Sequence, residues 1–161
     1  MSMDINAFTD GGTPTYLAGA DPTRRVTDFA SHTTAASDYF PVWLKCLADD
    51  VTIEGSMMNG AVQGAEAALA IISYIREVYE QSQKFKYAGP IGDDGFIEIY
   101  NARVRGEPIG GAVEVTRNAV GQVQHIAANY RPRDTVLFLS RLLGEHFAGS
   151  PIGEHFATPE A

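Results

Sequence analysis

The sequence predicts an α+β fold in which an antiparallel sheet packs against helices. Three alternating apolar and polar runs lie between residues 92 and 133 and are separated by the turn sequences RGEP and NAVG. This pattern is typical of a three-stranded antiparallel meander. A long amphipathic stripe follows Gly64, and a second helical pattern follows Pro132. A chain of 161 residues is the size of one domain.

The composition is that of an acidic globular protein with a net charge of −8. Because phosphate groups are bound by fields of lysine and arginine, we expect neither nucleic acid nor an anionic membrane as a partner. The single cysteine, Cys46, lies in an apolar run and is expected to be a buried structural thiol. The sequence shows no secretion signal and no apolar run of membrane-spanning length, so we expect a cytoplasmic protein.

The first forty residues divide into an irregular arm and a helical region. Residues 23–37 place their apolar side chains on one helical face. Asp38 is a suitable N-cap for a second short helix, with Pro41 in its first turn. The expected division of the chain is an arm (1–22), one domain (23–147) and a C-terminal tail (148–161).

Local patterns predict the remaining elements. Alternation indicates short strands over residues 51–54 and 84–88. The apolar stripe predicts a long helix from Gly64 to Glu80, and a further helix is expected over residues 134–147. The sequence GEHFA occurs twice near the C-terminus, but neighbouring helical residues point apart, so we expect no metal site there.

Alternation along the meander separates two faces of the sheet. Glu98, Tyr100 and Tyr130 fall on the inner face, together with most of the apolar residues. Glu114 and His125 fall on the outer face. Because the outer face also carries apolar residues, it could meet a second subunit.

The order of these elements resembles the nuclear transport factor 2-like superfamily, in particular its SnoaL-like and ketosteroid isomerase-like members. The resemblance is carried by LADDVTIEG, by the long helix after it, and by GEPIGGAVEVTRNAVGQVQHIAANYRP. It covers residues 23–144 and implies a cystatin-like fold, in which a curved antiparallel sheet wraps around a long helix as a cone-shaped α+β barrel. It also implies a largely apolar pocket that needs no metal and no organic cofactor.

The sequence departs from the ketosteroid isomerases at three positions. In those enzymes a carboxylate base follows the segment that reads ADDVTIE here, and a tyrosine and a protonated carboxylic acid bind the enolate oxygen. The base position matches Gly55, the acid position matches Val113, and the tyrosine position falls near Ala30 and Ser31. We therefore do not expect classical steroid isomerisation.

The resemblance implies that the inner face lines the pocket. Desolvation there would raise the pKa of Glu98, which could then act as a general acid or base. Tyr100 and Tyr130 could donate hydrogen bonds to a carbonyl or phenolate oxygen. The alternative is that Glu98 lies at the mouth of the cone or forms an ion pair with Arg103, Arg105, Arg117 or Arg131. The other expected ligand-binding residues are Trp43, Met57, Ile71, Ala102, Val113, Val115, Gln124, Ile126 and Ala128.

Two functions remain open from the sequence. The first is a small-molecule pocket protein of the SnoaL-like type, either a binding protein or a cofactor-independent isomerase, cyclase or lyase with Glu98 as its acid/base. Its ligand would be a largely apolar carbonyl compound or a polyketide-like ring. The second is a non-catalytic dimeric binding or scaffold module, which the missing isomerase residues favour. We expect a homodimer that forms through the outer sheet face, where His125 would be an interface residue.

Overall fold

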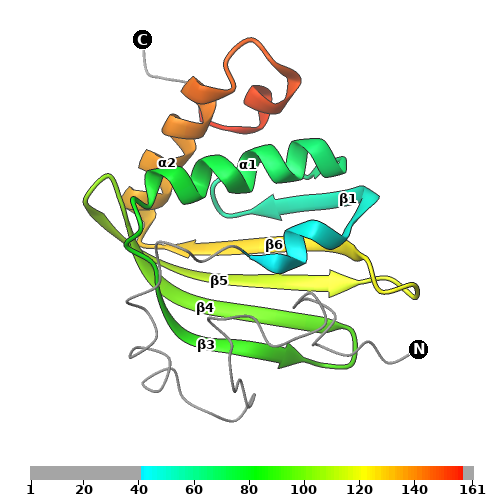
Figure 1. Ribbon diagram of the computed structural model, residues 1–161. Coiled ribbons are helices and arrows are strands. Elements are labelled where there is room, and N and C mark those ends of the chain that lie inside the picture. Colours follow the sequence, from blue (N-terminus) through cyan, green and yellow to red (C-terminus); the bar gives the residue numbers. More distant parts are fainter. Residues whose placement is uncertain (1–40, 158–161) are drawn as a thin grey trace.

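The computed structural model describes residues 41–157, which form one six-stranded sheet with two α-helices (Figure 1). In chain order the elements are η4 (Val42–Cys46), β1 (Leu47–Gly55), β2 (Val62–Gln63), α1 (Ala65–Val78), β3 (Lys84–Ile91), β4 (Gly95–Val104), β5 (Glu107–Arg117), β6 (Val123–Arg131), α2 (Arg133–His146) and η5 (Pro151–His155). The α+β class is confirmed. The expected arm over 1–22, the expected helix over 23–37 and the cap at Asp38 lie outside the described residues.

The sheet is antiparallel except at one pairing. Strands β4, β5 and β6 form the expected three-stranded meander, and β3 extends it to four strands, each pairing antiparallel with the next. Strand β1 lies beside β6 and runs parallel to it, and the short β2 pairs with the other edge of β1. Figure 1 shows the curved sheet with α1 lying across one face and α2 at the end where β6 finishes. Helix α1 therefore covers one face of the sheet.

Residues with positive φ angles lie before and after the long helix. Gly64 precedes it with φ 119°, a conformation that favours glycine. The helix ends at Val78, two residues before the expected end at Glu80. Glu80 and Gln81 have φ 49° and 63°, which a right-handed helix cannot continue. Within residues 41–157, no helix is long and apolar enough to cross a membrane.

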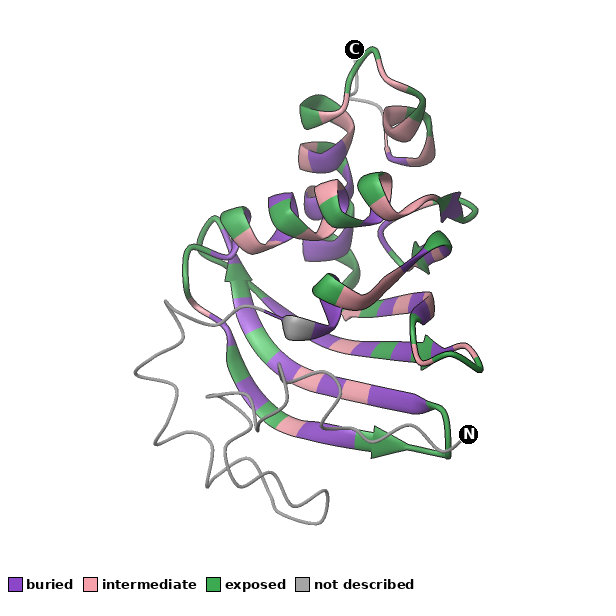
Figure 2. Ribbon diagram, turned by 45° about the vertical axis from the view of Figure 1, so that its right-hand side comes forward, coloured by how far each residue is buried: buried purple, intermediate pink, exposed green. Residues whose placement is uncertain are grey.

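The alternation expected for β4 is present in the fold. Phe96, Glu98 and Tyr100 are buried on the inner face, whereas Asn101 and Arg103 are exposed on the outer face. Figure 2 shows this banding of buried and exposed residues along the strands. The core therefore lies between the inner face of the sheet and the helices, which bury their apolar sides against it.

A change of register near the start of β6 changes which of its side chains point to the inner face of the sheet. The pairing of β5 with β6 shifts between Thr116 and Arg117, as at a β-bulge. Val123, expected on the outer face, is fully buried. Gln124, expected in the pocket, instead donates a hydrogen bond to Asp50 over 3.0 Å. Sequence alternation cannot predict a bulge, because the extra residue reverses the facing of the residues beyond it.

The chain after α2 folds back onto the domain. Phe156 is only 4% exposed, and a Cβ atom at Gly144 of α2 would collide with the carbonyl oxygen of Ala157. Nδ1 of His155 donates to the carbonyl oxygen of Asn59 over 2.8 Å, and the amide of Asn59 donates to the carbonyl oxygen of His155 over the same distance. These contacts tie η5 to the loop between β1 and β2.

Candidate ligand-binding pocket

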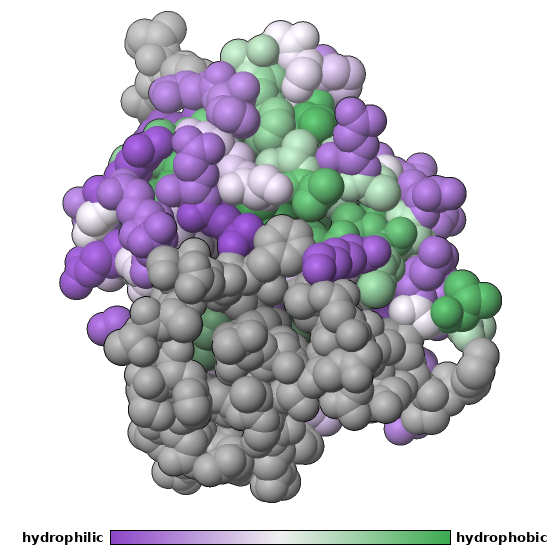
Figure 3. Space-filling view, viewed as in Figure 1, coloured by the Kyte–Doolittle hydropathy of each residue, from purple (hydrophilic) through white to green (hydrophobic). Residues whose placement is uncertain are grey.

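A pocket with an empty volume of about 430 Å³, including its mouth, lies between the inner face of the sheet, the C-terminal half of α1, and η4. The lining residues are Pro41, Trp43, Ile53, Ile72, Ile75, Arg76, Tyr79, Gln83, Glu98, Tyr100, Val113, Ile126, Ala128 and Tyr130. Figure 3 shows that hydrophobic side chains also reach the surface around α1 and β1, elements that contribute to this lining.

Glu98 is the buried carboxyl group of the pocket. The pleat of β4 turns its side chain inward, where it is 3% exposed. Nε1 of Trp43 donates to Oε1 of Glu98 over 3.1 Å. Because a buried carboxylate is costly unless it is hydrogen-bonded, η4 stabilises Glu98 in this position. Arg76 also lines the pocket and brings a positive charge to the same space.

Three of the arginines considered as partners for Glu98 lie elsewhere. Arg103 and Arg131 are exposed on the outer face of the sheet. Nη1 of Arg105 lies 3.8 Å from Oε1 of Glu80 at the end of α1. Glu98 also lies inside the fold and not at its rim, since its side chain is almost completely buried.

Three tyrosine hydroxyl groups form a chain beside Glu98. The hydroxyl oxygens of Tyr79 and Tyr100 are 2.9 Å apart, and the hydroxyl of Tyr100 donates to that of Tyr130 over 3.3 Å. Each hydroxyl has one proton, and the proton of Tyr100 is donated to Tyr130. Tyr79 is therefore the donor in its hydrogen bond with Tyr100. The proton of Tyr130 is then left over to donate into the pocket.

Gly111 makes room for this tyrosine chain. It lies on β5 between Tyr100 of β4 and Tyr130 of β6, and it pairs with both residues. A Cβ atom at Gly111 would lie 2.9 Å from Cε1 of Tyr130 and 3.0 Å from Cζ of Tyr100. The absence of a side chain therefore lets the two rings converge over the middle strand.

Burial keeps the three tyrosines protonated. Desolvation raises the pKa of Tyr79 and of Tyr100 well above the usual value, and the charge of Tyr130 adds to this effect in both cases. Desolvation also raises the pKa of Tyr130, but hydrogen bonds from Tyr100 and Tyr79 act in the opposite direction. All three groups are thus neutral hydrogen-bond donors near pH 7, and the network favours Tyr130 as the one that would carry negative charge.

The structure brings together part of the set expected from the sequence. Seven expected residues line the pocket: Trp43, Glu98, Tyr100, Val113, Ile126, Ala128 and Tyr130. The side chains of Met57, Ile71 and Val115 are buried in the core but are outside this lining. Ala102 lies at an open groove at the end of the sheet, and Gln124 is turned toward Asp50.

Sequence reasoning missed Tyr79, Gly111, Gln83 and Arg76. Tyr79 follows the apolar spacing of the long helix, which predicts a packing residue and gives no sign of a role for its hydroxyl group. The one available signal for Gly111 was a pair of glycines inside a strand pattern, which indicates a close approach. Gln83 and Arg76 belong to no pattern that points to a pocket.

The position that matches the isomerase base has no space for a side chain. A Cβ atom at Gly55 would collide with the carbonyl oxygen of Ala128 and would lie 2.8 Å from Sδ of Met57. Val113 is buried in the pocket lining at the position that matches the acid. Among residues 41–157, no three histidine, cysteine, aspartate or glutamate side chains are grouped as metal ligands.

Comparison with known proteins identifies the fold. No protein-family model matches the sequence, and no curated protein matches it. An uncharacterised bacterial protein with a cystatin-like fold from Silicibacter pomeroyi matches with a TM-score of 0.61 at 17% identity, over 83% of this chain and 91% of that one. A steroid delta-isomerase from Pseudomonas aeruginosa matches with the same score and identity, over 74% and 91%.

A de novo designed protein with a curved β-sheet is also similar, with a TM-score of 0.53 at 15% identity over 88% of this chain and all of that one. At these identities the likeness is one of fold. The chain therefore has the cystatin-like, nuclear transport factor 2-like fold that the sequence resemblance predicts.

Proposed function

We propose that this protein binds a small, largely apolar molecule with a carbonyl or phenolic oxygen and catalyses a cofactor-independent proton transfer on it. The observation that carries the proposal is the buried carboxyl group of Glu98 in an apolar pocket, close to the tyrosine chain that ends at Tyr130. The charge of Glu98 raises the pKa of both Tyr79 and Tyr130, in keeping with its position beside them.

In this reaction Glu98 acts as the general base and then as the general acid. Its carboxylate removes a proton from the carbon next to the ligand carbonyl, and the electron pair moves onto the carbonyl oxygen. The protonated Glu98 then returns the proton to another carbon of the conjugated system, which completes an isomerisation. The indole N–H of Trp43 holds the carboxyl group in place through both steps.

Tyr130 stabilises the enolate oxygen. Its hydroxyl donates to that oxygen while accepting a hydrogen bond from Tyr100, which in turn accepts one from Tyr79. Because all three phenols remain protonated in the buried site, they provide donors that are already oriented toward developing negative charge.

The likeness to the steroid delta-isomerase supports a reaction of the isomerase type. Gly55 and Val113 stand where that resemblance would require the base and the acid, so the proposed reaction uses different residues. The same two positions favour the alternative function, a non-catalytic module that holds a hydrophobic ligand in the pocket.

Trp43 provides a direct assay for ligand binding, because it is the only tryptophan and lies in the pocket lining. We would titrate steroids, polyketide phenolics and small enones while recording its fluorescence, and then follow turnover of every ligand that binds. Glu98→Gln should bind the ligand with little change, because the amide oxygen still accepts from Trp43. Turnover should fall by about 100-fold or more, the usual contribution of a general acid or base.

Glu145→Gln is the matched control, since Glu145 is an exposed carboxylate on α2 and lies outside the pocket lining and the sheet. It should leave both binding and turnover unchanged. Binding without turnover in the wild-type protein would establish the non-catalytic alternative. No binding of any of the three ligand classes would contradict both functions.

We also propose that the outer sheet face forms a homodimer. Ile97, Ile99, Ala112 and Ala127 are only half-buried there, although they occupy central strands. Light scattering after size exclusion should give twice the chain mass. Ile97→Lys should yield a folded monomer, whereas Ala119→Lys, in the exposed turn before β6, should leave the dimer intact. A wild-type monomer at micromolar concentration would exclude this interface.

A further inference from the structure

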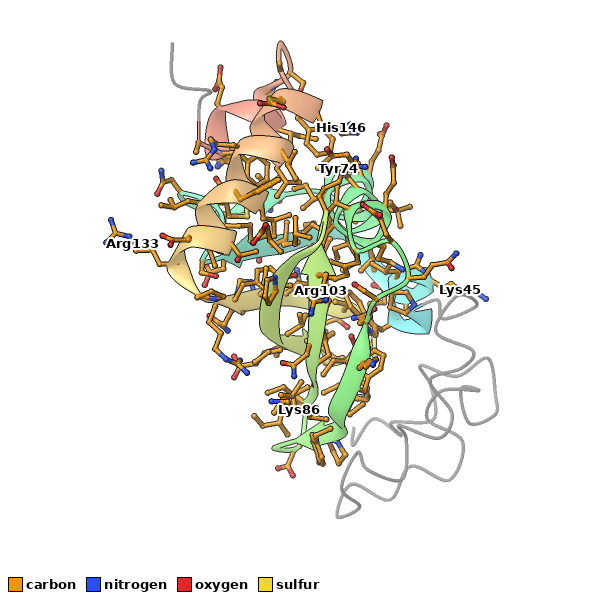
Figure 4. All side chains as sticks on the ribbon, turned by 90° about the vertical axis from the view of Figure 1, so that its left-hand side faces the viewer. Lys45, Tyr74, Lys86, Arg103, Arg133 and His146 are labelled. Carbon is orange, nitrogen blue, oxygen red and sulfur yellow. The ribbon has the colours of Figure 1, made fainter. Side chains whose placement is uncertain are left out.

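An open groove at one end of the sheet gathers three positive charges. It lies on the outer face, where β4 and β6 end and β3 and β5 begin, and it is separate from the ligand pocket. Its charged lining comes from Lys84, Arg103 and Arg131, and its polar side chains are those of Ser82 and Asn101. Figure 4 views the molecule from this end of the sheet and labels Arg103.

Strand register aligns these side chains. Lys84 pairs with Asn101, Asn101 with Gly110, and Gly110 with Arg131, so the four residues form one row across β3, β4, β5 and β6. Residues in one row project from the same face of a sheet, and Arg103 follows Asn101 by two residues on that same face. The three cations therefore point to the same side.

Gly110 allows Arg131 to reach across the sheet. A Cβ atom at Gly110 would lie 2.6 Å from Cζ and 2.8 Å from both terminal nitrogens of Arg131. The guanidinium group consequently lies over β5, one strand inward from its own backbone. This brings its charge closer to β4 and β3, which carry Arg103 and Lys84.

In the described part of the chain, the three cations of the groove form no ion pair. No carboxylate among residues 41–157 lies within ion-pair distance of Lys84, Arg103 or Arg131. Arg103 is oriented by a hydrogen bond from Nη1 to the carbonyl oxygen of Gly106, 2.9 Å long. This is unexpected in a chain with 20 acidic and 12 basic residues, because most cations in such a chain have acidic neighbours available.

We propose that this groove binds an oxyanion, the phosphate or carboxylate group of a small molecule. Guanidinium groups bind such groups through two parallel hydrogen bonds, and Lys84 adds a third positive charge. Asn101, between Lys84 and Gly110, supplies an amide donor in the same row. The site does not depend on the reaction proposed for the pocket.

The test is a titration of the ¹⁵N-labelled protein, followed by amide chemical shifts at constant ionic strength. Inorganic phosphate, pyrophosphate and citrate are the probes, and sodium chloride is the control. We expect saturable shifts confined to the adjoining ends of the four meander strands. Binding of the two phosphates alone identifies phosphate as the ligand group, binding of citrate alone identifies carboxylate, and either result supports the proposal.

Two variants in the groove and one control variant outside it test the geometry. Arg131→Ala should weaken binding by about tenfold or more, because a charge-assisted hydrogen bond is lost. Arg141→Ala removes the same charge from an exposed position on α2 and should change the affinity by less than about twofold. Gly110→Ala keeps the net charge but displaces the guanidinium group, so it should also weaken binding.

Three results would overturn the proposal. The first is an absence of saturable shifts with all three anions. The second is equal weakening by Arg131→Ala and Arg141→Ala, which would indicate general screening. The third is unchanged affinity in Gly110→Ala. Circular dichroism checks that each variant is folded, and the wild-type titration decides the proposal even if one of them is not.

Discussion

The buried tyrosine chain predicts a steep loss of stability at alkaline pH. Tyr79 and Tyr100 are 2% and 3% exposed, and burial raises the pKa of each well above the usual value. In the unfolded chain both ionise near pH 10. The stability that arises from their raised pKa is therefore complete below about pH 10, and it is lost as the pH rises toward the folded-state values.

The size of this effect follows from proton linkage. A group that is ionised in the unfolded chain but protonated in the folded one lowers the free energy of unfolding by about 1.4 kcal/mol per pH unit. Tyr79 and Tyr100 together contribute about 3 kcal/mol per pH unit above pH 10. Tyr130 contributes less, because it is only half-buried and the other two hydroxyls favour its ionised form.

Urea unfolding between pH 8 and pH 11 measures this slope. Above pH 10, the free energy of unfolding should fall less steeply with pH in the double variant Tyr79→Phe, Tyr100→Phe than in the wild-type protein. The two slopes should differ by about 3 kcal/mol per pH unit. Tyr74→Phe is the control, because its ring stacks on His146 and its hydroxyl is outside the network (Figure 4). Equal slopes in the wild-type protein and the double variant would refute the reasoning.

Three further substitutions test other parts of the structure. Phe156→Ala should lower the free energy of unfolding by about 3 kcal/mol, seen as a lower urea midpoint, and should increase amide exchange in η5; exchange that stays protected would contradict this. Gly55→Ala should cost about 1–3 kcal/mol in the same assay, because its methyl group collides with the backbone of β6. Tyr130→Phe should weaken ligand binding by about tenfold, measured by Trp43 fluorescence, if the ligand oxygen accepts from Tyr130.

Much of the sheet could be predicted because its strands follow simple alternation. The inward facing of Glu98 and Tyr100 follows from a period of two along β4, which has no irregularity in its pairing with β5. The C-terminal end of α1 was harder to predict from the sequence. The helix stops just before Glu80 and Gln81, which adopt left-handed conformations that neither residue type requires. The shift near Arg117 is likewise invisible in the sequence, because it depends on how two strands pair.

The pocket was only partly predictable, because its polar contacts join residues far apart in the chain. Trp43 and Glu98 are separated by 55 residues, and no local pattern links an indole on a short helix to a carboxylate in a strand. The tyrosine chain depends on cross-strand register and on the missing side chain at Gly111. Sequence alternation gives the side of the sheet on which a residue lies, but not its neighbours across the strands.

The parallel pairing of β1 with β6 has a consequence for the order of folding. Thr52 and His125, which pair in this ladder and lie 2.6 Å apart at Oγ1 and Nδ1, are 73 residues apart in the chain. The hairpins of the meander close much shorter loops and should form first, since loop closure costs more entropy as loops lengthen. Ile53 enters the pocket wall only when β1 docks, so the chain should gain its binding cavity in the last and slowest step of folding.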